Sequence, residues 1–257
     1  MKRIIFLIPV AFALVLFFVC RPVPYKTVEL TVSGAQGRAL ALFELSEDKG
    51  AVFLDSVYPA KRHQNQFRFP CKDLRIYTLF APRSKESLVL LPVENEPLCL
   101  STNYDSLVSG AKLCGKADRT VNRDVLNYQK RVLQTECQIE AIEQNWLSGR
   151  YTVTNVDSLH TACSRSIDSL FSNLRQEAIQ LCQQHTDNLL PVFIANKTVG
   201  KRTIFDMNNS GDIIFLKNCA DALVKNLPFS GHAARLLFNA ERAESRLKQR
   251  HFFDEIR

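Results

Sequence analysis

Residues 27–34 read Thr-Val-Glu-Leu-Thr-Val-Ser-Gly, an alternation of polar and apolar side chains that ends at a Ser-Gly pair. Successive side chains of a strand point to opposite faces, so this pattern predicts a half-buried β-strand followed by a turn. Similar short runs follow at near-regular spacing between turn residues: 39–45, 51–57, 66–69, 75–80, 87–91 and 97–101. Short strands spaced in this way predict an antiparallel β-sandwich or barrel-like domain over residues 25–112.

The second part of the chain, residues 113–257, has the period of a helix. Apolar residues recur at helical spacing from Val121 to Trp146, and Asp118 or Thr120 can cap the start of this helix. A second helix is expected to begin at Asp157 and to form a hairpin with the first. Shorter helices are predicted over 189–195, 213–226 and 231–248, the last capped near Ser230. The predicted fold class is therefore α+β, a strand-rich domain followed by a helical hairpin and shorter helices.

The first 20 residues have the pattern of an export signal. Lys2 and Arg3 precede an apolar run of 17 residues, Ile4–Cys20, which Pro9 alone interrupts. A basic start followed by an apolar stretch is typical of a secretory signal, and this length is at the lower limit for a membrane span, roughly 17–25 residues. The segment is therefore predicted to be a signal peptide or a membrane anchor.

The border of this segment favours lipidation. Small residues that an ordinary signal peptidase requires are missing between Phe17 and Lys26, whereas Phe17–Cys20 is similar to a bacterial lipobox, in which the cysteine carries the lipid. Cys20 is the predicted lipidation site; an uncleaved anchor and a soluble periplasmic form are the alternatives. Residues 21–24, Arg-Pro-Val-Pro, lack the acidic run typical of surface display, so a periplasm-facing position in the cell envelope is expected.

The charge of the chain does not indicate a polyanionic partner. Without Lys2 and Arg3 the 33 basic residues fall to 31 against 26 acidic ones, a net charge of +5, and no Lys/Arg block gathers this excess. Export also argues against nucleic acid. The expected partners are the membrane, through the N-terminal segment or its lipid, and another envelope protein.

The seven cysteines after Cys20 do not form an evident disulfide framework. Their number is odd, no Cys-x-x-Cys occurs, and most lie in apolar contexts typical of buried small side chains. His160/Cys163 and Cys182/His185 each have the spacing of metal ligands. On one continuous helix, however, the two cysteines would lie about 28 Å apart, too far for one tetrahedral site.

Searches for other chemistry find no catalytic, cofactor or metal motif. The chain contains no glycine-rich phosphate loop, no His-Glu-x-x-His and no Gly-x-Ser-x-Gly. His63 and His232 are isolated and expected to be exposed. No catalytic residue and no cofactor are predicted.

A tripeptide of Asp, Ser and an aliphatic residue occurs four times. It is similar to the acceptor pattern for O-glycosylation in some envelope-dwelling anaerobes, although Asp-Ser is also ordinary turn and helix-cap chemistry. The candidate O-glycosylation sites are Ser56, Ser106, Ser158 and Ser169.

The order of these features resembles a known family. The stretches LFELSEDKGAVFLDSVYPAKRHQNQFRF (42–69), IYTLFAPRSKESLVLLPVENEPLCL (76–100) and LVSGAKLCGKADRTVNRDVLNYQ (107–129) follow the signal. Together they resemble the N-terminal accessory domain, of unknown function, of envelope thiol-disulfide proteins of the thioredoxin-like peroxiredoxin type. The thioredoxin-like redox domain of that family is expected to be missing here, since the chain ends about where it would begin. The resemblance transfers no catalytic residue.

Three functional hypotheses follow. The first is a non-catalytic, lipid-anchored envelope protein that binds a partner through its strand-rich half. The second is an accessory module that docks in trans with a separate thioredoxin-like redox protein. The third is a thiol-active or hydrolytic enzyme built from isolated residues.

Overall fold

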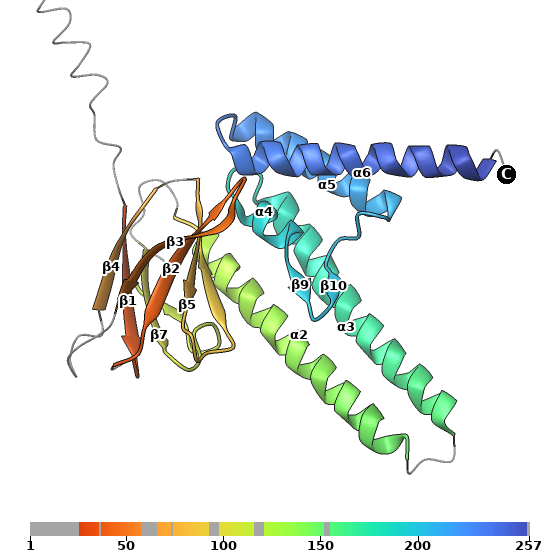
Figure 1. The fold of residues 1–257 in the computed structure, drawn as a ribbon, viewed down its shortest axis with the longest axis horizontal. Coiled ribbons are helices and arrows are strands. Elements are labelled where there is room, and N and C mark those ends of the chain that lie inside the picture. The colour runs from red at the N-terminus through yellow and green to blue at the C-terminus, as the bar shows by residue number, and fades with distance from the viewer. Residues whose placement is uncertain are drawn as a thin grey trace, which may run out of the picture.

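The computed structural model describes residues 26–35, 37–57, 66–72, 74–92, 98–115, 121–151 and 155–255. The protein is α+β, as the sequence predicts: two four-stranded sheets precede a set of long helices (Figure 1). The expected signal or anchor segment with Cys20, the capping candidates Asp118 and Thr120, and His63 lie outside the described residues.

The strand-rich half consists of two open sheets. One has the order β4-β1-β7-β8 and the other the order β3-β2-β5-β6. The strands are β1 (Lys26–Ser33), β2 (Leu40–Ser46), β3 (Gly50–Val57), β4 (Gln66–Cys71), β5 (Ile76–Phe80), β6 (Ser87–Leu90), β7 (Leu98–Asn103) and β8 (Lys112–Leu113). Seven of these strands overlap the seven predicted runs.

Side chains from both sheets form one hydrophobic core. Leu30 of β1, Leu42 of β2 and Leu79 of β5 are almost fully buried and belong to the same apolar cluster. Alternate residues of β1, β2 and β7 supply this core, which is why polar-apolar alternation predicts these strands correctly. The two sheets therefore form a sandwich-like arrangement, and neither closes into a barrel.

One strand pair differs from the predicted antiparallel domain. β1 and β7 pair in parallel, from Val28 opposite Leu98 to Ser33 opposite Asn103. Between β1 and β7 the chain forms the four strands of the other sheet and also β4. β7 then returns beside β1 and runs in the same direction. The alternation of side chains carries no information about that return. β8 has only two residues, too few for a recognisable pattern.

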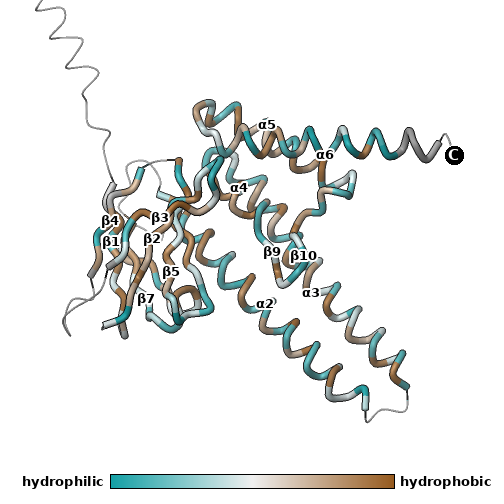
Figure 2. Tube along the Cα trace, viewed as in Figure 1, coloured by the Kyte–Doolittle hydropathy of each residue, from teal (hydrophilic) through white to brown (hydrophobic). Residues whose placement is uncertain are grey.

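The helical half begins with the predicted hairpin. Its helices are α2 (Val121–Gly149), α3 (Val156–Gln184), α4 (Leu190–Ala195), α5 (Ser210–Asn226) and α6 (Gly231–Glu255), and β9 (Thr198–Val199) pairs with β10 (Arg202–Thr203). Hydrophobic and hydrophilic segments alternate along α2 and α3 (Figure 2). None of the helices within the described residues is long and apolar enough to span a membrane.

The start of α6 follows the expected chemistry, whereas α3 and α5 begin earlier than predicted. α5 starts at Ser210 rather than Ile213, because the Asn209 side chain accepts the Asp212 N–H and caps the helix. α6 begins after Ser230, whose hydroxyl accepts the Ala233 N–H, as predicted. α3 begins at Val156 rather than Asp157, because the side chain of Asn155 accepts the Ser158 N–H at 2.9 Å and acts as the N-cap.

A second core joins the two halves. Ile76 and Leu91, from the sheet that contains β2 and β5, pack in one cluster with Val125, Leu190 and Leu236 of the helices. The same sheet therefore faces the sandwich core on one side and, over part of its other side, the helices. This arrangement places the tip of the β2–β3 hairpin beside α4 and α6 (Figure 1).

Candidate binding site at the β2–β3 hairpin

The β2–β3 hairpin ends in a tight turn at residues 47–49. The Ser46 hydroxyl accepts the backbone N–H groups of Asp48 and Lys49, at 3.4 and 3.3 Å. Gly50 follows with a φ of 73°, a backbone conformation that favours glycine. The turn chemistry of Ser-x-x-x-Gly thus fixes where the chain reverses.

The tip of this hairpin is seated on the first turns of α6. Arg235 donates a hydrogen bond to the backbone carbonyl of Glu47 and lies 3.4 Å from the Asp48 carboxylate. The Glu47 carboxylate also pairs with Arg75 at 3.2 Å. A Cβ atom at Gly231 would collide with this carboxylate, so glycine permits the close approach.

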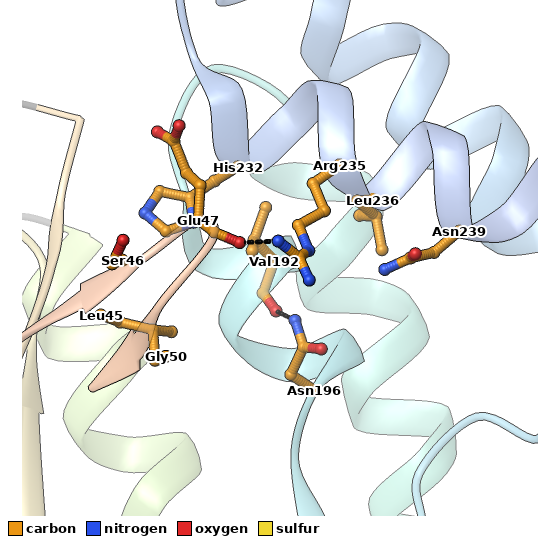
Figure 3. Close-up of a pocket in the computed structure, with 10 residues that line it drawn as sticks. All are labelled: Leu45, Ser46, Glu47, Gly50, Val192, Asn196, His232, Arg235, Leu236 and Asn239. Carbon is orange, nitrogen blue, oxygen red and sulfur yellow. Dashed lines mark hydrogen bonds between the residues drawn. The ribbon is translucent and has the colours of Figure 1, made fainter. Parts of the chain in front are cut away.

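A cavity of about 230 Å³ lies between the hairpin and helices α4 and α6. Figure 3 shows the side chains of Arg235 and Asn239 reaching from α6 toward the hairpin, with Asn196 at the end of α4. Asn196 donates to the Val192 carbonyl at 2.8 Å. The cavity therefore combines an apolar floor with hydrogen-bond donors, the composition of a site that orients a small polar group.

His232 lines this cavity and is buried, whereas the sequence predicts an exposed histidine. It is 5% exposed because the hairpin covers the start of α6. Within the described residues its buried Nε2 has no hydrogen-bond partner. Burial lowers the pKa of His232, although Glu47 and a hydrogen bond to the Leu45 backbone act in the opposite direction. The lowered pKa favours the neutral form of the imidazole ring, and the buried Nε2 makes no hydrogen bond within the described residues.

Ser46 of the cavity is engaged in the turn of the hairpin. Ser46 is the only hydroxyl among the cavity-lining residues, and its oxygen is occupied by the turn N–H groups. A hydroxyl nucleophile needs a base within hydrogen-bond reach. The described contacts provide no hydrogen bond between Ser46 and His232.

Beyond the cavity, the outer face of the hairpin carries an aromatic patch, defined here as Phe43, Phe53 and Phe80. The Phe43 ring packs edge-on against Phe53 and Phe80, with centroids 5.7 and 6.4 Å away. Phe53 is 54% exposed and Phe80 38% exposed. Contiguous exposed aromatic surface of this kind is typical of interaction sites.

Strand β3 is an edge strand within the described part of the chain. Its pairing partner is β2 alone, and every described side chain from Gly50 to Ser56 is exposed. A register shift near Leu42 and Phe43 leaves Leu54 as the extra residue of a β-bulge. Val52, Phe53 and Leu54 therefore form an apolar, solvent-exposed sheet edge.

The candidate O-glycosylation sites are spread over the molecule. Ser56 is exposed on β3, Ser158 and Ser169 are exposed on α3, and Ser106 is half-buried in the turn after β7. The Ser158 N–H serves the cap of α3, and the Ser106 carbonyl accepts the Gly110 N–H. The Asp-Ser tripeptides thus serve turns and helix starts in two of the four cases.

The cysteines are less uniformly buried than the sequence predicts. Cys71, Cys182 and Cys219 are buried, but Cys137 is exposed and the other three are half-buried. Burial raises the pKa of Cys71 to about 12, and burial together with the neighbouring Cys114 raises that of Cys99 to about 11. The reactive form of a cysteine is the thiolate, so neither is an activated nucleophile at neutral pH.

The two His/Cys pairs lie at opposite ends of one continuous helix, as their spacing predicts for α3. His185 instead contacts Asp124 of α2 through Nε2 at 2.9 Å and Asn188 through Nδ1 at 3.1 Å. Among the residues that the structure describes, no group of three or more His, Cys, Asp or Glu side chains could hold a metal ion.

Comparison of the chain with models of known protein families gave no match. Comparisons with curated proteins and with solved structures gave none either.

Proposed function

We propose that the protein is a non-catalytic binding module of the cell envelope that binds an extended segment of a partner protein along strand β3. The observation that carries this proposal is the exposed apolar edge formed by Val52, Phe53 and Leu54. The proposed binding surface therefore lies in the strand-rich half.

An edge strand presents backbone N–H and C=O groups that a further strand can pair with. Proteins normally protect such edges with charges, prolines or a covering element. Here three consecutive apolar residues occupy the edge, and the described side chains of β3 are exposed on both faces. A second strand would satisfy the backbone and cover these side chains at once.

The aromatic patch supplies anchors beside this edge. Aromatic side chains dominate binding energy at interfaces because each covers a large area at a small entropic cost. Phe53 belongs both to β3 and to the patch, so it is the expected centre of the contact. The partner segment is accordingly expected to be apolar and extended.

The cavity beside α6 extends the same surface. It starts at Gly50, the first residue of β3, so a segment paired with β3 reaches it at one end. Arg235 and Asn239 can donate hydrogen bonds there to a polar side chain or a terminal carboxylate. The edge would then give affinity and the cavity would fix the register.

We further propose that lipidation of Cys20 holds this module at the envelope, facing the periplasm. The lipobox-like Phe17–Cys20 supports this placement. Metabolic labelling with a fatty-acid probe tests it: the wild type should be labelled and the Cys20→Ala variant should not. Equal labelling of both proteins would rule out lipidation at this residue.

The binding proposal is tested with Phe53→Ser. The purified, tagged chain is incubated with envelope extract, and captured proteins are quantified against Phe238→Ser as the matched control, since Phe238 is 60% exposed on α6. Loss of a central aromatic anchor should weaken capture of the true partner about tenfold or more. Thermal unfolding checks that both variants are folded.

The partner is expected to bind the control like the wild type and to protect the backbone amides of β3 from hydrogen exchange. A captured thioredoxin-like protein that is lost with Phe53→Ser and retained with Phe238→Ser would show that the module docks in trans with a redox protein. Equal capture of every protein by the wild type and by Phe53→Ser would contradict binding at β3.

A further inference from the structure

Four of the cysteines lie in two pairs, which their positions in the sequence do not reveal. Cys99 belongs to β7, and Cys114 directly follows β8. The register of these strands, with Leu100 opposite Leu113, places the two cysteines opposite each other. The Cys114 N–H donates to the Cys99 carbonyl at 2.9 Å, which confirms that the two residues are paired across the strands.

The second pair lies inside the helical core. Cys182, in the last turn of α3, and Cys219 of α5 are both buried. The Cys219 thiol donates to the Cys182 carbonyl oxygen at 3.8 Å.

Both placements suit a disulfide. Residues directly opposite on antiparallel strands have Cα atoms about 4.5–5.5 Å apart, inside the range of about 4.4–6.8 Å that disulfides span. For the buried pair, the Cys219 thiol lies against the backbone of Cys182, so the two residues are neighbours inside the helical core.

We propose that Cys99–Cys114 and Cys182–Cys219 are two disulfide sites, which close when the protein meets a disulfide-bearing oxidant of the thiol–disulfide exchange class. One cysteine thiolate attacks the oxidant's disulfide, whose S–S bond breaks and releases one thiolate. The second cysteine attacks the resulting mixed disulfide, forms the intramolecular S–S bond and releases the other sulfur. Two electrons and two protons pass from each cysteine pair to the oxidant, which leaves as a dithiol.

The two sites differ in when they close. Cys99 and Cys114 are half-buried, so the oxidant can reach them in the folded protein. Cys182 and Cys219 are buried, so their bond forms while the chain folds. Burial keeps this pair away from an oxidant in solution, so exchange in the folded protein is slow.

Peptide mapping of the full chain tests both assignments. The protein is refolded with reduced and oxidised glutathione, alkylated, and digested with trypsin without reduction. Cleavage after Lys112 separates Cys99 from Cys114, and cleavages after Lys197 and Lys217 separate Cys182 from Cys219. Each pair should appear as one linked peptide, lighter by about 2 Da than the sum of its reduced parts because two hydrogens are lost.

The variants Cys114→Ser and Cys219→Ser should each abolish one link and leave the other. Cys137→Ser, which removes an exposed cysteine, should leave both. If a variant fails to fold, the wild-type map still decides the question. An assignment is overturned if both cysteines of the pair are found alkylated after oxidative refolding. It is also overturned if either of them is linked to Cys71, Cys137 or Cys163.

Discussion

At the scale of single residues, His232, which lies between the β2–β3 hairpin and α6, makes the stability of the protein depend on pH. Burial lowers its pKa below the ordinary value of 6.5. Below that value the unfolded chain binds a proton that the folded protein resists, so stability falls as pH decreases and is unaffected above it. Glu44, Glu47 and Arg75 also act on this ring, and the two carboxylates oppose the effect of burial.

We therefore predict that His232→Asn flattens the acid side of the stability profile. The asparagine amide is polar and close in size to the imidazole ring but cannot take up a proton. Urea midpoints measured at about pH 7.5 and about pH 5.5 should fall less in the variant than in the wild type. The control is His185→Asn, which removes a half-buried histidine paired with Asp124. Parallel profiles for the wild type and His232→Asn would contradict this role.

The sequence could not indicate that His232 is buried. The residues that cover it belong to a hairpin far away along the chain, as the contact between Arg235 and Glu47, 188 residues apart, illustrates. Helical periodicity places His232 in the first turn of α6 but does not state what packs against that turn. The paired thiols were missed for the same reason, since Cys182 and Cys219 meet only when α5 returns to α3.

At the scale of elements, two amide side chains of α2 complete the edge of the second sheet. Gln129 accepts the Val89 N–H at 2.7 Å and donates to the Val89 carbonyl at 3.0 Å. Asn122 makes the same pair of bonds with Leu91, at 3.0 and 2.8 Å. These amides take the place of a neighbouring strand along β6, and they fix the start of α2 against the sheet.

We predict that Gln129→Ala lowers the free energy of unfolding by about 1–3 kcal/mol, because two backbone groups lose their partner beneath a helix. Urea denaturation at neutral pH measures the change. Gln138→Ala on the exposed face of the same helix controls for helix propensity and should shift stability by no more than about 0.5 kcal/mol. Equal effects of the two substitutions would mean that the Gln129 amide does not hold the sheet edge.

Elements that depend on local pattern were predictable, and their partners were not. Alternation located β1 and β2 to within one residue, since one face of each strand is buried. The parallel pairing of β1 with β7 depends on the path of the chain between them. The bonds of Gln129 and Asn122 to β6 were equally invisible, because a polar residue on a helix ordinarily faces solvent. The sequence predicts residues 51–57 as a strand, which is confirmed as β3, but its pattern does not show that this strand lies at the edge of the sheet.

At the scale of the whole molecule, the α2–α3 hairpin projects from the body as a two-helix arm (Figure 1). The buried residues of α2 end at Thr135, and those of α3 begin at Leu174. Beyond these points the helices are stabilised mainly by each other. Trp146 and His160 pack edge-on with ring centroids 6.0 Å apart, and the Arg150 guanidinium lies 5.4 Å from the Trp146 ring.

We predict that the outer part of this arm opens before the rest of the protein. The outer segments, residues 140–149 and 156–170, are helical stretches of about 10–15 residues, which are marginally stable without tertiary contacts, and local stability follows buried contacts. Amides of residues 140–149 and 156–170 should exchange faster with deuterium than those of residues 121–135 and 174–184. Trp146→Ala should accelerate exchange in the outer segments alone, since it removes their largest shared contact. Uniform protection along both helices, or loss of protection at the base in Trp146→Ala, would show that the arm and the body unfold as one unit.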